Sequence, residues 1–456
     1  MRKVLIANRG EIAVRVIRAC HDLGLETVAV YSQSDAEALH VLHAGEAICI
    51  GEAPSHKSYL KIANILSACE ITGADAIHPG YGFLSENANF ASICESCGVL
   101  FIGPSPKTIR LLGDKAKAKE TAQRAGCPII PGSDGPVQTV SEALEIAKQL
   151  GFPIFIKAVA GGGGRGIRVA YAEEEFDKLF LAARTEAQVC FANPDVYLEK
   201  MIHNPRHIEV QVIGDVFGNY IHLGERDCTI QRRRQKLIEE TPSPILTDDM
   251  RHALGEAAVR IAKEAGYSSV GTVEFLLDAN KNFYFMEVNT RVQVEHTVTE
   301  ELTGIDIVAL QIRLARGEKL SLTQKDIRFD GHVFQFRINA EDPLKDFMPS
   351  PGRLEYYVAP GGPHVRIDSA CYTGYTIPPN YDSMIAKLIV KGKNRQEAIT
   401  RALRALSEFH IGGVKTTIPF HLDILRQKAF LDSDYDLGYV DNLIASGHRF
   451  GQSTDA

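Results

Sequence analysis

The chain has 456 residues, about three times the length of an ordinary domain, so we expect two to four domains. Its 45% hydrophobic and 23% charged residues are typical of globular proteins and exclude collagen-like, coiled-coil and wholly disordered chains. The net charge of -7 gives no overall attraction toward nucleic acid or an anionic membrane, so we expect neither as a partner. Nine cysteines without framework spacing are typical of reduced thiols, which indicates a cytoplasmic protein.

Short apolar runs alternate with helical patterns over the first hundred residues. The runs at 4–7, 27–31, 47–50, 74–77 and 99–102 predict strands, and the patterns between them predict helices. Because these runs are continuously apolar, we expect a parallel, doubly wound sheet that is buried on both faces. Ligands bind such sheets at the carboxyl ends of the strands, which here are residues 8–10 and 78–82.

Turn-forming residues divide the rest of the chain. Clusters of glycine and proline at 103–104 and 131–136, and the change of pattern past Gly331, predict a first unit that ends near Gly103, a second unit of different pattern and a mixed α+β third unit. The remaining residues, 448–456, are polar and predict a flexible tail.

A glycine-tipped hairpin is predicted within the second domain. Apolar strands at 152–157 and 166–170 flank four consecutive glycines at 161–164. Glycine backbone N–H groups can approach an anion closely, and Lys157 and Arg165 add charge for phosphate oxygens. The alternative is a flexible linker, but a linker is rarely bracketed by two apolar strands. The pattern favours a mobile loop that covers a phosphate.

Two apolar strands around a polar turn at 273–287 predict a second hairpin. If the chain turns about Asn280 and Lys281, Glu274 and Glu287 face each other, and a divalent cation would relieve their repulsion. The alternation continues with Asn289 and three more polar residues of the same parity up to Glu295, so we expect one strand with a polar face. The alternative for that face is ordinary solvent exposure.

Residues 231–236 form the strongest basic run of the chain, and Arg226 precedes it. Such a run can bind nucleic acid or a small anion. It lacks interleaved aromatic residues and lies in an acidic chain, so a small anion is favoured. His207 opens an apolar strand, where a histidine is more often structural than functional.

Four motifs together resemble the biotin carboxylase family of ATP-grasp enzymes. They are residues 6–13, residues 78–87, the glycine hairpin and residues 287–296, and the resemblance covers nearly the whole chain. It implies a doubly wound pre-ATP-grasp domain at 1–112, an ATP-grasp domain at 113–330 with a mobile glycine-rich lid over about 131–203, and an α+β C-terminal domain at 331–447. It also implies an ATP-dependent ligase that carboxylates biotin with bicarbonate through carboxyphosphate, giving ADP and phosphate.

The resemblance implies a role for each matching position. Glu295 would be the general base and Arg337 would stabilise the biotin oxygen, with Lys236 and Arg291 completing the catalytic set. Biotin would be bordered by Tyr81, Gly82 and Arg337, and bicarbonate would be held by Lys236, Arg291, Gln293, Val294 and Glu295. Two Mg²⁺ or Mn²⁺ ions would be bound by Glu274, Glu287 and Asn289. ATP would be bound by Lys115, Lys157, Gly163, Gly164, Glu199, Lys200, Ile202, His207, Gln231, Arg234, Glu274 and Glu287.

The family also implies partners and a cellular role. No lysine of the sequence is flanked by methionines as in biotin carriers, so we expect biotin on a separate carrier protein and a separate carboxyltransferase. A homodimer serving acetyl-CoA carboxylase in fatty acid synthesis, in the cytoplasm or the plastid stroma, is the favoured interpretation. The alternatives are another acyl-CoA or pyruvate carboxylase, an ATP-grasp ligase with a different acceptor, and an inactive nucleotide-binding subunit. Arg234 departs from the histidine common in the family.

Overall fold

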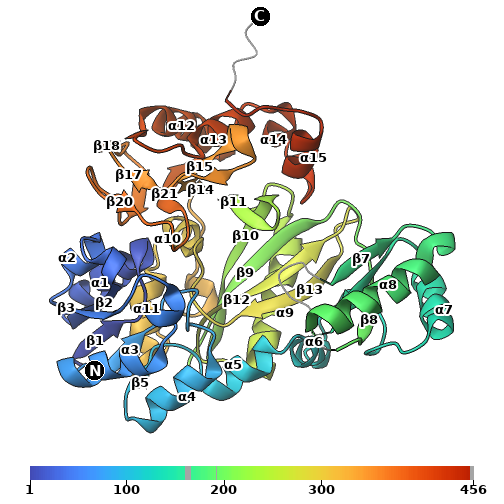
Figure 1. Ribbon diagram of the computed structural model, residues 1–456, viewed down its shortest axis with the longest axis horizontal. Coiled ribbons are helices and arrows are strands. Elements are labelled where there is room, and N and C mark those ends of the chain that lie inside the picture. The colour runs from blue at the N-terminus through green and yellow to red at the C-terminus, as the bar shows by residue number, and fades with distance from the viewer. Residues whose placement is uncertain (160–165, 192, 452–456) are drawn as a thin grey trace, which may run out of the picture. The chain divides into compact units, whose positions relative to one another are not determined.

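The structure is a computed structural model that describes residues 1–159, 166–191 and 193–451 (Figure 1). The chain divides into two compact units. The first comprises Met1–Cys127, Arg206–Phe275 and Glu287–Ala456, and the second comprises Pro128–Pro205 and Leu276–Met286.

The first unit begins with a five-stranded parallel sheet of order β3-β2-β1-β4-β5, as the sequence predicts. Alternate residues of its central strand enter two different cores. Val4 and Ile6 pack with α1, whereas Leu5 and Ala7 pack on the opposite face of the sheet. The expected burial of both faces is therefore confirmed. The elements are β1 (Lys3–Ile6), α1 (Gly10–Asp22), β2 (Glu26–Ser32), α2 (Leu39–His43), β3 (Glu46–Gly51), α3 (Ile62–Thr72), β4 (Ala76–His78), α4 (Ala88–Ser96), β5 (Leu100–Phe101), α5 (Pro106–Gly113) and α6 (Lys115–Arg124).

The two strand ends that the sequence singles out meet each other. The side-chain amide of Asn8 donates hydrogen bonds of 2.7 Å to the carbonyls of Pro79 and Tyr81. Gly80 has φ +60°, and a Cβ at this position would lie 2.9 Å from that amide nitrogen. Glycine is therefore required for the loop that presents Tyr81.

An eight-stranded sheet of order β13-β12-β9-β10-β11-β14-β21-β19 follows. It contains strands from before residue 330 and also β14, β19 and β21 from the C-terminal region. Phe334, Phe336 and Ile338 of β14 enter a core with α12 and α13, so the residues between them, Gln335 and Arg337, point to the other face. The strands are β9 (Arg206–Gly214), β10 (Tyr220–Arg232), β11 (Gln235–Thr241), β12 (Ser269–Leu277), β13 (Phe283–Asn289), β14 (His332–Asn339), β19 (Val365–Ser369) and β21 (Met384–Gly392).

Helices and three short strand pairs complete this unit. The helices are α9 (Asp248–Glu264), α10 (His296–Thr303), α11 (Ile307–Ala315), α12 (Arg395–Glu408), α13 (Ile418–Ile424), α14 (Lys428–Leu431) and α15 (Tyr439–Ala445). The pairs join β15 (Glu341–Asp342) to β16 (Met348–Pro349), β17 (Gly352–Arg353) to β20 (Thr376–Ile377), and β18 (Tyr356–Val358) to β22 (His410–Gly412). The mixed α+β character expected for the C-terminal region is confirmed.

The second unit contains a three-stranded sheet of order β7-β6-β8 with its own core. Strands β6 and β7 are antiparallel, which confirms the strands of the glycine hairpin. Its tip, including Gly163 and Gly164, lies outside the described residues. The elements are α7 (Val140–Leu150), β6 (Ile154–Ala158), β7 (Ile167–Ala170), α8 (Glu173–Phe191) and β8 (Val196–Lys200).

Candidate active site

Lys236 lies at the centre of a cluster of carboxylates on the eight-stranded sheet. Its Nζ is 2.6 Å from Oε2 of Glu209, 3.0 Å from Oε1 of Glu274 and 2.7 Å from Oε1 of Glu295. Burial alone would lower the pKa of this ammonium, but the three carboxylates raise it well above its usual value. Lys236 is therefore a permanent cation that fixes three acidic side chains.

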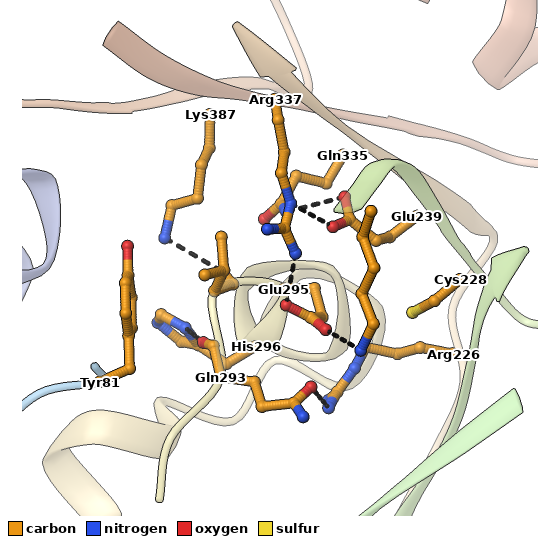
Figure 2. A network of polar contacts seen from close by, with 12 residues as sticks. Tyr81, Arg226, Cys228, Glu239, Gln293, Glu295, His296, Gln335, Arg337 and Lys387 are labelled. Carbon is orange, nitrogen blue, oxygen red and sulfur yellow. Dashed lines mark hydrogen bonds and ion pairs between the residues drawn. The ribbon is translucent and has the colours of Figure 1, made fainter. Parts of the chain in front are cut away.

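Glu295 is held by a second cation, Arg337 (Figure 2). The guanidinium donates from Nη2 to Oε2 of Glu295 at 2.9 Å and from Nε to Oε1 of Glu239 at 2.6 Å. Burial would raise the pKa of Glu295, but Lys236, Arg337 and Arg226 outweigh it and hold that pKa far below its usual value. One carboxylate oxygen faces Lys236 and the other faces Arg337, so Glu295 is ionised and oriented at once.

Arg226, whose side chain is fully buried, contacts this cluster through Glu209. Its Nε donates to Oε1 of Glu209 at 2.5 Å, and its Nη1 donates to Gln211 at 2.8 Å and to Thr299 at 3.0 Å. These bonds leave Oε2 of Glu209 directed at Lys236. Arg226 therefore belongs to the support of the site and not to an exposed basic patch.

His207 and Gln231 lie beside Glu274. Nε2 of His207 is 3.0 Å from Oε2 of Glu274, and Nδ1 is 3.0 Å from the side-chain amide of Gln231. Burial would raise the pKa of Glu274, but Lys236 and His207 hold it well below its usual value. His207 thus contacts the predicted site, although by sequence alone a structural role is the more usual one.

Glu274 and Glu287 come from adjacent strands, as predicted, but the turn between them differs. The amide of Asp278 donates to the carbonyl of Asn282 at 2.9 Å, so the turn is centred on Asn280 and not between Asn280 and Lys281. Burial and the charge of Glu274 nevertheless raise the pKa of Glu287. The two carboxylates therefore still interact electrostatically, and a divalent cation bound between them would relieve their repulsion.

The expected strand does not continue to Glu295. Strand β13 ends at Asn289, residues 290–295 are irregular, and α10 begins at His296. The polar residues still converge, because the side-chain amides of Asn289 and Gln293 both donate to Oε1 of Glu274 at 2.9 Å. The prediction of one polar strand face was therefore wrong, and the irregular segment brings these groups together.

Arg291 is tied down at the start of this irregular segment. Its Nε donates to Oε2 of Glu86 at 2.9 Å, and its Nη2 donates to Oδ1 of Asn289 at 2.8 Å. Glu86 also accepts a bond of 3.1 Å from the amide of Thr290. The motif at 78–87 and the motif at 287–296 are thus joined through Glu86.

Tyr81 and Gly82 lie in the loop after β4. The hydroxyl of Tyr81 donates to Oε1 of Glu11, and Gly82 has φ +70° and is exposed. Val294 presents its carbonyl to Nζ of Lys387 at 3.1 Å. Figure 2 shows Lys387 and Arg337 directed toward the segment that carries Glu295, with Tyr81 to one side of it.

The remaining predicted nucleotide-binding residues are distributed over both units. In the first unit, Lys115 opens α6 and is exposed, and Arg234 is exposed in the β10–β11 turn. In the second unit, Lys157 forms an ion pair with Glu199. Lys200 donates to the carbonyl of Gly151 at 2.5 Å, and Ile202 is half-buried after β8.

Sequence reasoning missed three charged side chains at this site: Glu209, Glu239 and Lys387. Each lies within a β-strand and is fully buried. Glu209 shares the parity of His207 on β9, a signal that could have identified it. Lys387 is the single charged residue in the interior of the apolar run 384–390, and buried lysines are rare without a partner.

A metal could be accommodated by more than one set of these residues. Among the described residues, His207, Glu209 and Glu274 each offer a ligand atom within 4.8 Å of the others, as do Glu209, Cys228 and Glu295. Lys236 supplies positive charge to Glu209, Glu274 and Glu295 in both groups. Glu287 is a further candidate ligand beside Glu274, because burial and the charge of Glu274 raise its pKa.

No helix in the described part of the chain is both long and apolar enough to cross a membrane.

Three family models match the chain in sequence order. Residues 1–109 match the biotin carboxylase N-terminal domain, residues 114–323 match the ATP-binding domain of the carbamoyl-phosphate synthase L chain, and residues 335–442 match the biotin carboxylase C-terminal domain. The matches and the charged site together define the class of protein as an ATP-dependent ligase with an ATP-grasp domain.

Individual relatives agree with this class. The chain is 55% identical to biotin carboxylase 1 of Bacillus subtilis over 98% of its own length and 100% of the relative's. A solved complex of Campylobacter jejuni biotin carboxylase with beta-gamma-ATP is 49% identical, covers 97% of this chain and 98% of that one, and has a TM-score of 0.92.

A third relative belongs to a different carboxylase. It is the biotin carboxylase domain dimer of Hydrogenobacter thermophilus 2-oxoglutarate carboxylase, solved with MgADP, ADP and bicarbonate. It is 52% identical, covers 97% of this chain and 98% of that one, and has a TM-score of 0.91. The chain belongs to the biotin carboxylase family, and the resemblance seen in its sequence is confirmed.

Proposed function

We propose that this biotin carboxylase acts on biotin attached to a separate carrier protein and supplies the first half-reaction of acetyl-CoA carboxylase in fatty acid synthesis. A match over the full length of Bacillus biotin carboxylase 1 supports a stand-alone subunit. The similar identity to the 2-oxoglutarate carboxylase domain supports the second candidate, a subunit of another biotin-dependent carboxylase.

The arrangement of Glu295 between Lys236 and Arg337 is the observation that carries the proposed chemistry. Glu295 removes the proton of bicarbonate, and the freed oxygen attacks the γ-phosphorus of ATP, giving carboxyphosphate and ADP. Lys236, Arg291, Gln293 and Val294 position bicarbonate. Glu295 is suited to this role because its two cationic neighbours keep it ionised.

Carboxyphosphate then breaks down to CO₂ and phosphate beside biotin. The phosphate takes the ureido proton, and the ureido nitrogen attacks CO₂. Arg337 stabilises the negative charge that develops on the ureido oxygen, because a fixed guanidinium costs little reorganisation during the reaction. Tyr81 and Gly82 border the biotin ring.

The proposed ATP contacts are those that the family resemblance implies. The C. jejuni relative, solved with beta-gamma-ATP, supports a nucleotide site in this chain. Lys115, Lys157 and the glycine loop with Gly163 and Gly164 bind phosphate oxygens. Lys200, whose ammonium donates to the carbonyl of Gly151, belongs to the proposed nucleotide-binding segment at the end of β8. The other contacts come from Glu199, Ile202, His207, Gln231 and Arg234.

Two divalent cations, Mg²⁺ or Mn²⁺, are held by Glu274, Glu287 and Asn289. The assignment is supported by geometry, because Glu274 and Glu287 lie on adjacent strands and the side-chain amide of Asn289 is 2.9 Å from Oε1 of Glu274. Burial and the charge of Glu274 raise the pKa of Glu287. The MgADP in the H. thermophilus relative supports this assignment. When bound, the ions neutralise charge on the transferred phosphoryl group.

The proposed partners are a second copy of this chain, a biotin carrier protein and a carboxyltransferase. The dimeric state of the H. thermophilus domain supports the homodimer. We place the enzyme in the cytoplasm, or in the plastid stroma if the chain is a processed form.

Transfer of labelled carbon from bicarbonate to two biotinylated carriers tests the choice of complex. The carrier of an acetyl-CoA carboxylase should be labelled much faster than the carrier domain of a pyruvate or 2-oxoglutarate carboxylase. Faster labelling of the second carrier would assign the chain to that complex.

A further inference from the structure

A buried ion pair on the edge of the candidate site carries no role in the proposed reaction. Lys387 is fully buried on β21, and its Nζ is 2.9 Å from Oε2 of Glu11, in the first turn of α1. Burying a lysine and a glutamate is costly unless their contacts compensate. The contacts of this pair are therefore informative about what it does.

Lys387 and Arg337 are direct cross-strand neighbours, and both reach the same segment. Residue 387 pairs with residue 337 in the register of β14 and β21. Arg337 binds the side chain of Glu295 at 2.9 Å, whereas Lys387 donates to the carbonyl of Val294 at 3.1 Å. That carbonyl belongs to the peptide that joins Val294 to Glu295. The proposed base is thus held by its side chain and by its main chain from adjacent strands (Figure 2).

Glu11 extends the pair to the opposite wall. It accepts a hydrogen bond from Tyr81, whose ring borders the proposed biotin pocket. Burial raises the pKa of Glu11, while the charge of Lys387 opposes that rise. One ion pair therefore links the peptide of the base to the tyrosine beside biotin.

Asp368 completes the surroundings of Lys387. It is the cross-strand neighbour of Lys387 on β19, with Oδ2 at 3.9 Å from the ammonium, and it is itself bound by Arg366. Its longer distance makes Glu11 the nearer carboxylate, while the carbonyl of Val294 accepts the hydrogen bond.

We propose that Lys387 and Glu11 are positioning residues. They hold the Val294–Glu295 peptide at a fixed position relative to Tyr81, so that the base that activates bicarbonate is correctly placed relative to biotin. This inference rests on the proposed function and deepens it. Lys387 fixes the base, and Glu11 neutralises Lys387 while fixing Tyr81. ATP binding does not depend on either residue.

Lys387→Met tests the first half of the inference. The peptide loses its donor, so the KM for bicarbonate should rise about 10-fold and kcat should fall by up to about 100-fold, because small misplacements of a reacting group are costly. The KM for ATP should stay within about 2-fold of the parent value, because nucleotide contacts are untouched. Arg251→Met is a matched control, since it removes the 2.9 Å partner of buried Glu225 away from this pair.

The double variant Glu11→Gln with Lys387→Met separates positioning from stability. It leaves no unpaired buried charge and keeps an oxygen for Tyr81, so the free energy of unfolding should recover while the kinetic defect remains. It also carries the test if Lys387→Met does not fold. Recovery of bicarbonate KM and kcat together with stability would overturn the inference. A parent protein that folds and binds ATP but never responds to biotin would instead contradict the proposed function.

Discussion

Arg337 and Glu295 are in direct contact at the centre of the site, with Nη2 of the guanidinium 2.9 Å from Oε2 of the carboxylate. The same guanidinium holds Glu239 at 2.6 Å, so its orientation is fixed from two sides. Lys236 occupies the other oxygen of Glu295. A base and an electrostatic stabiliser for two successive steps therefore lie in direct contact before either substrate is bound.

Glu295→Gln should abolish bicarbonate-dependent ATP cleavage while leaving the affinity for ATP within about 2-fold, because the amide is isosteric but cannot accept the proton. Steady-state ADP release and nucleotide binding by calorimetry measure the two quantities. Glu301→Gln, on the same helix region but with a half-exposed side chain, is the control. Turnover at the parent rate would remove Glu295 as the base.

Glu287→Gln should raise the Mg²⁺ concentration needed for half-maximal activity by about 10-fold or more, because one of the two carboxylate ligands loses its charge. Activity is titrated with Mg²⁺ after removal of metal by a chelator. Glu264→Gln, which changes a carboxylate paired with Arg124 outside the site, should leave the titration unchanged. An unaltered Mg²⁺ requirement in Glu287→Gln would show that the ions bind elsewhere.

Glu240 should stabilise the C-terminal region in a pH-dependent way. It binds His332 at 2.7 Å, Arg395 at 2.8 Å and Tyr435 at 2.5 Å. Burial alone would raise its pKa, but His332 and Arg395 lower it from 4.5 to about 2. Glu240→Gln should cost about 3 kcal/mol of unfolding free energy at pH 7, because it leaves the half-buried guanidinium of Arg395 without its carboxylate partner.

The sign of the pH effect follows from that lowered pKa. The stabilisation by Glu240 is fully present above the unfolded pKa of 4.5 and is lost as the pH falls toward about 2. In urea unfolding, the difference between parent and Glu240→Gln should therefore be smaller at pH 3 than at pH 7. Tyr435→Phe, which removes one hydrogen bond and no charge, serves as the comparison. A difference that stays constant with pH would mean that Glu240 is not ionised in the folded protein.

The parallel sheet could be predicted because its cause is local. Each strand is a short apolar run and each helix has its own periodicity. Consecutive residues are therefore enough to predict a sheet that is buried on both faces. The glycine hairpin and the Glu274–Glu287 hairpin could be found for the same reason.

The site could be predicted only in part, because its contacts are distant in sequence. Lys236 and Glu295 are 59 residues apart and Arg337 and Glu239 are 98 apart, so no spacing rule relates them. Residues 290–295 follow an alternation that is typical of a strand, yet they are irregular, because their polar groups bond to Glu274, Glu86 and the main chain. Tertiary contacts override the local pattern at this segment.

The response of ATP cleavage to free biotin tests the central claim most directly. ADP formation is measured with Mg²⁺ and bicarbonate, first without biotin and then with increasing biotin. The site described here predicts slow cleavage that requires bicarbonate and rises severalfold with biotin, because the ureido nitrogen captures the CO₂ formed from carboxyphosphate. Cleavage that is saturated in ATP and bicarbonate but indifferent to biotin would contradict the assignment of biotin as the acceptor.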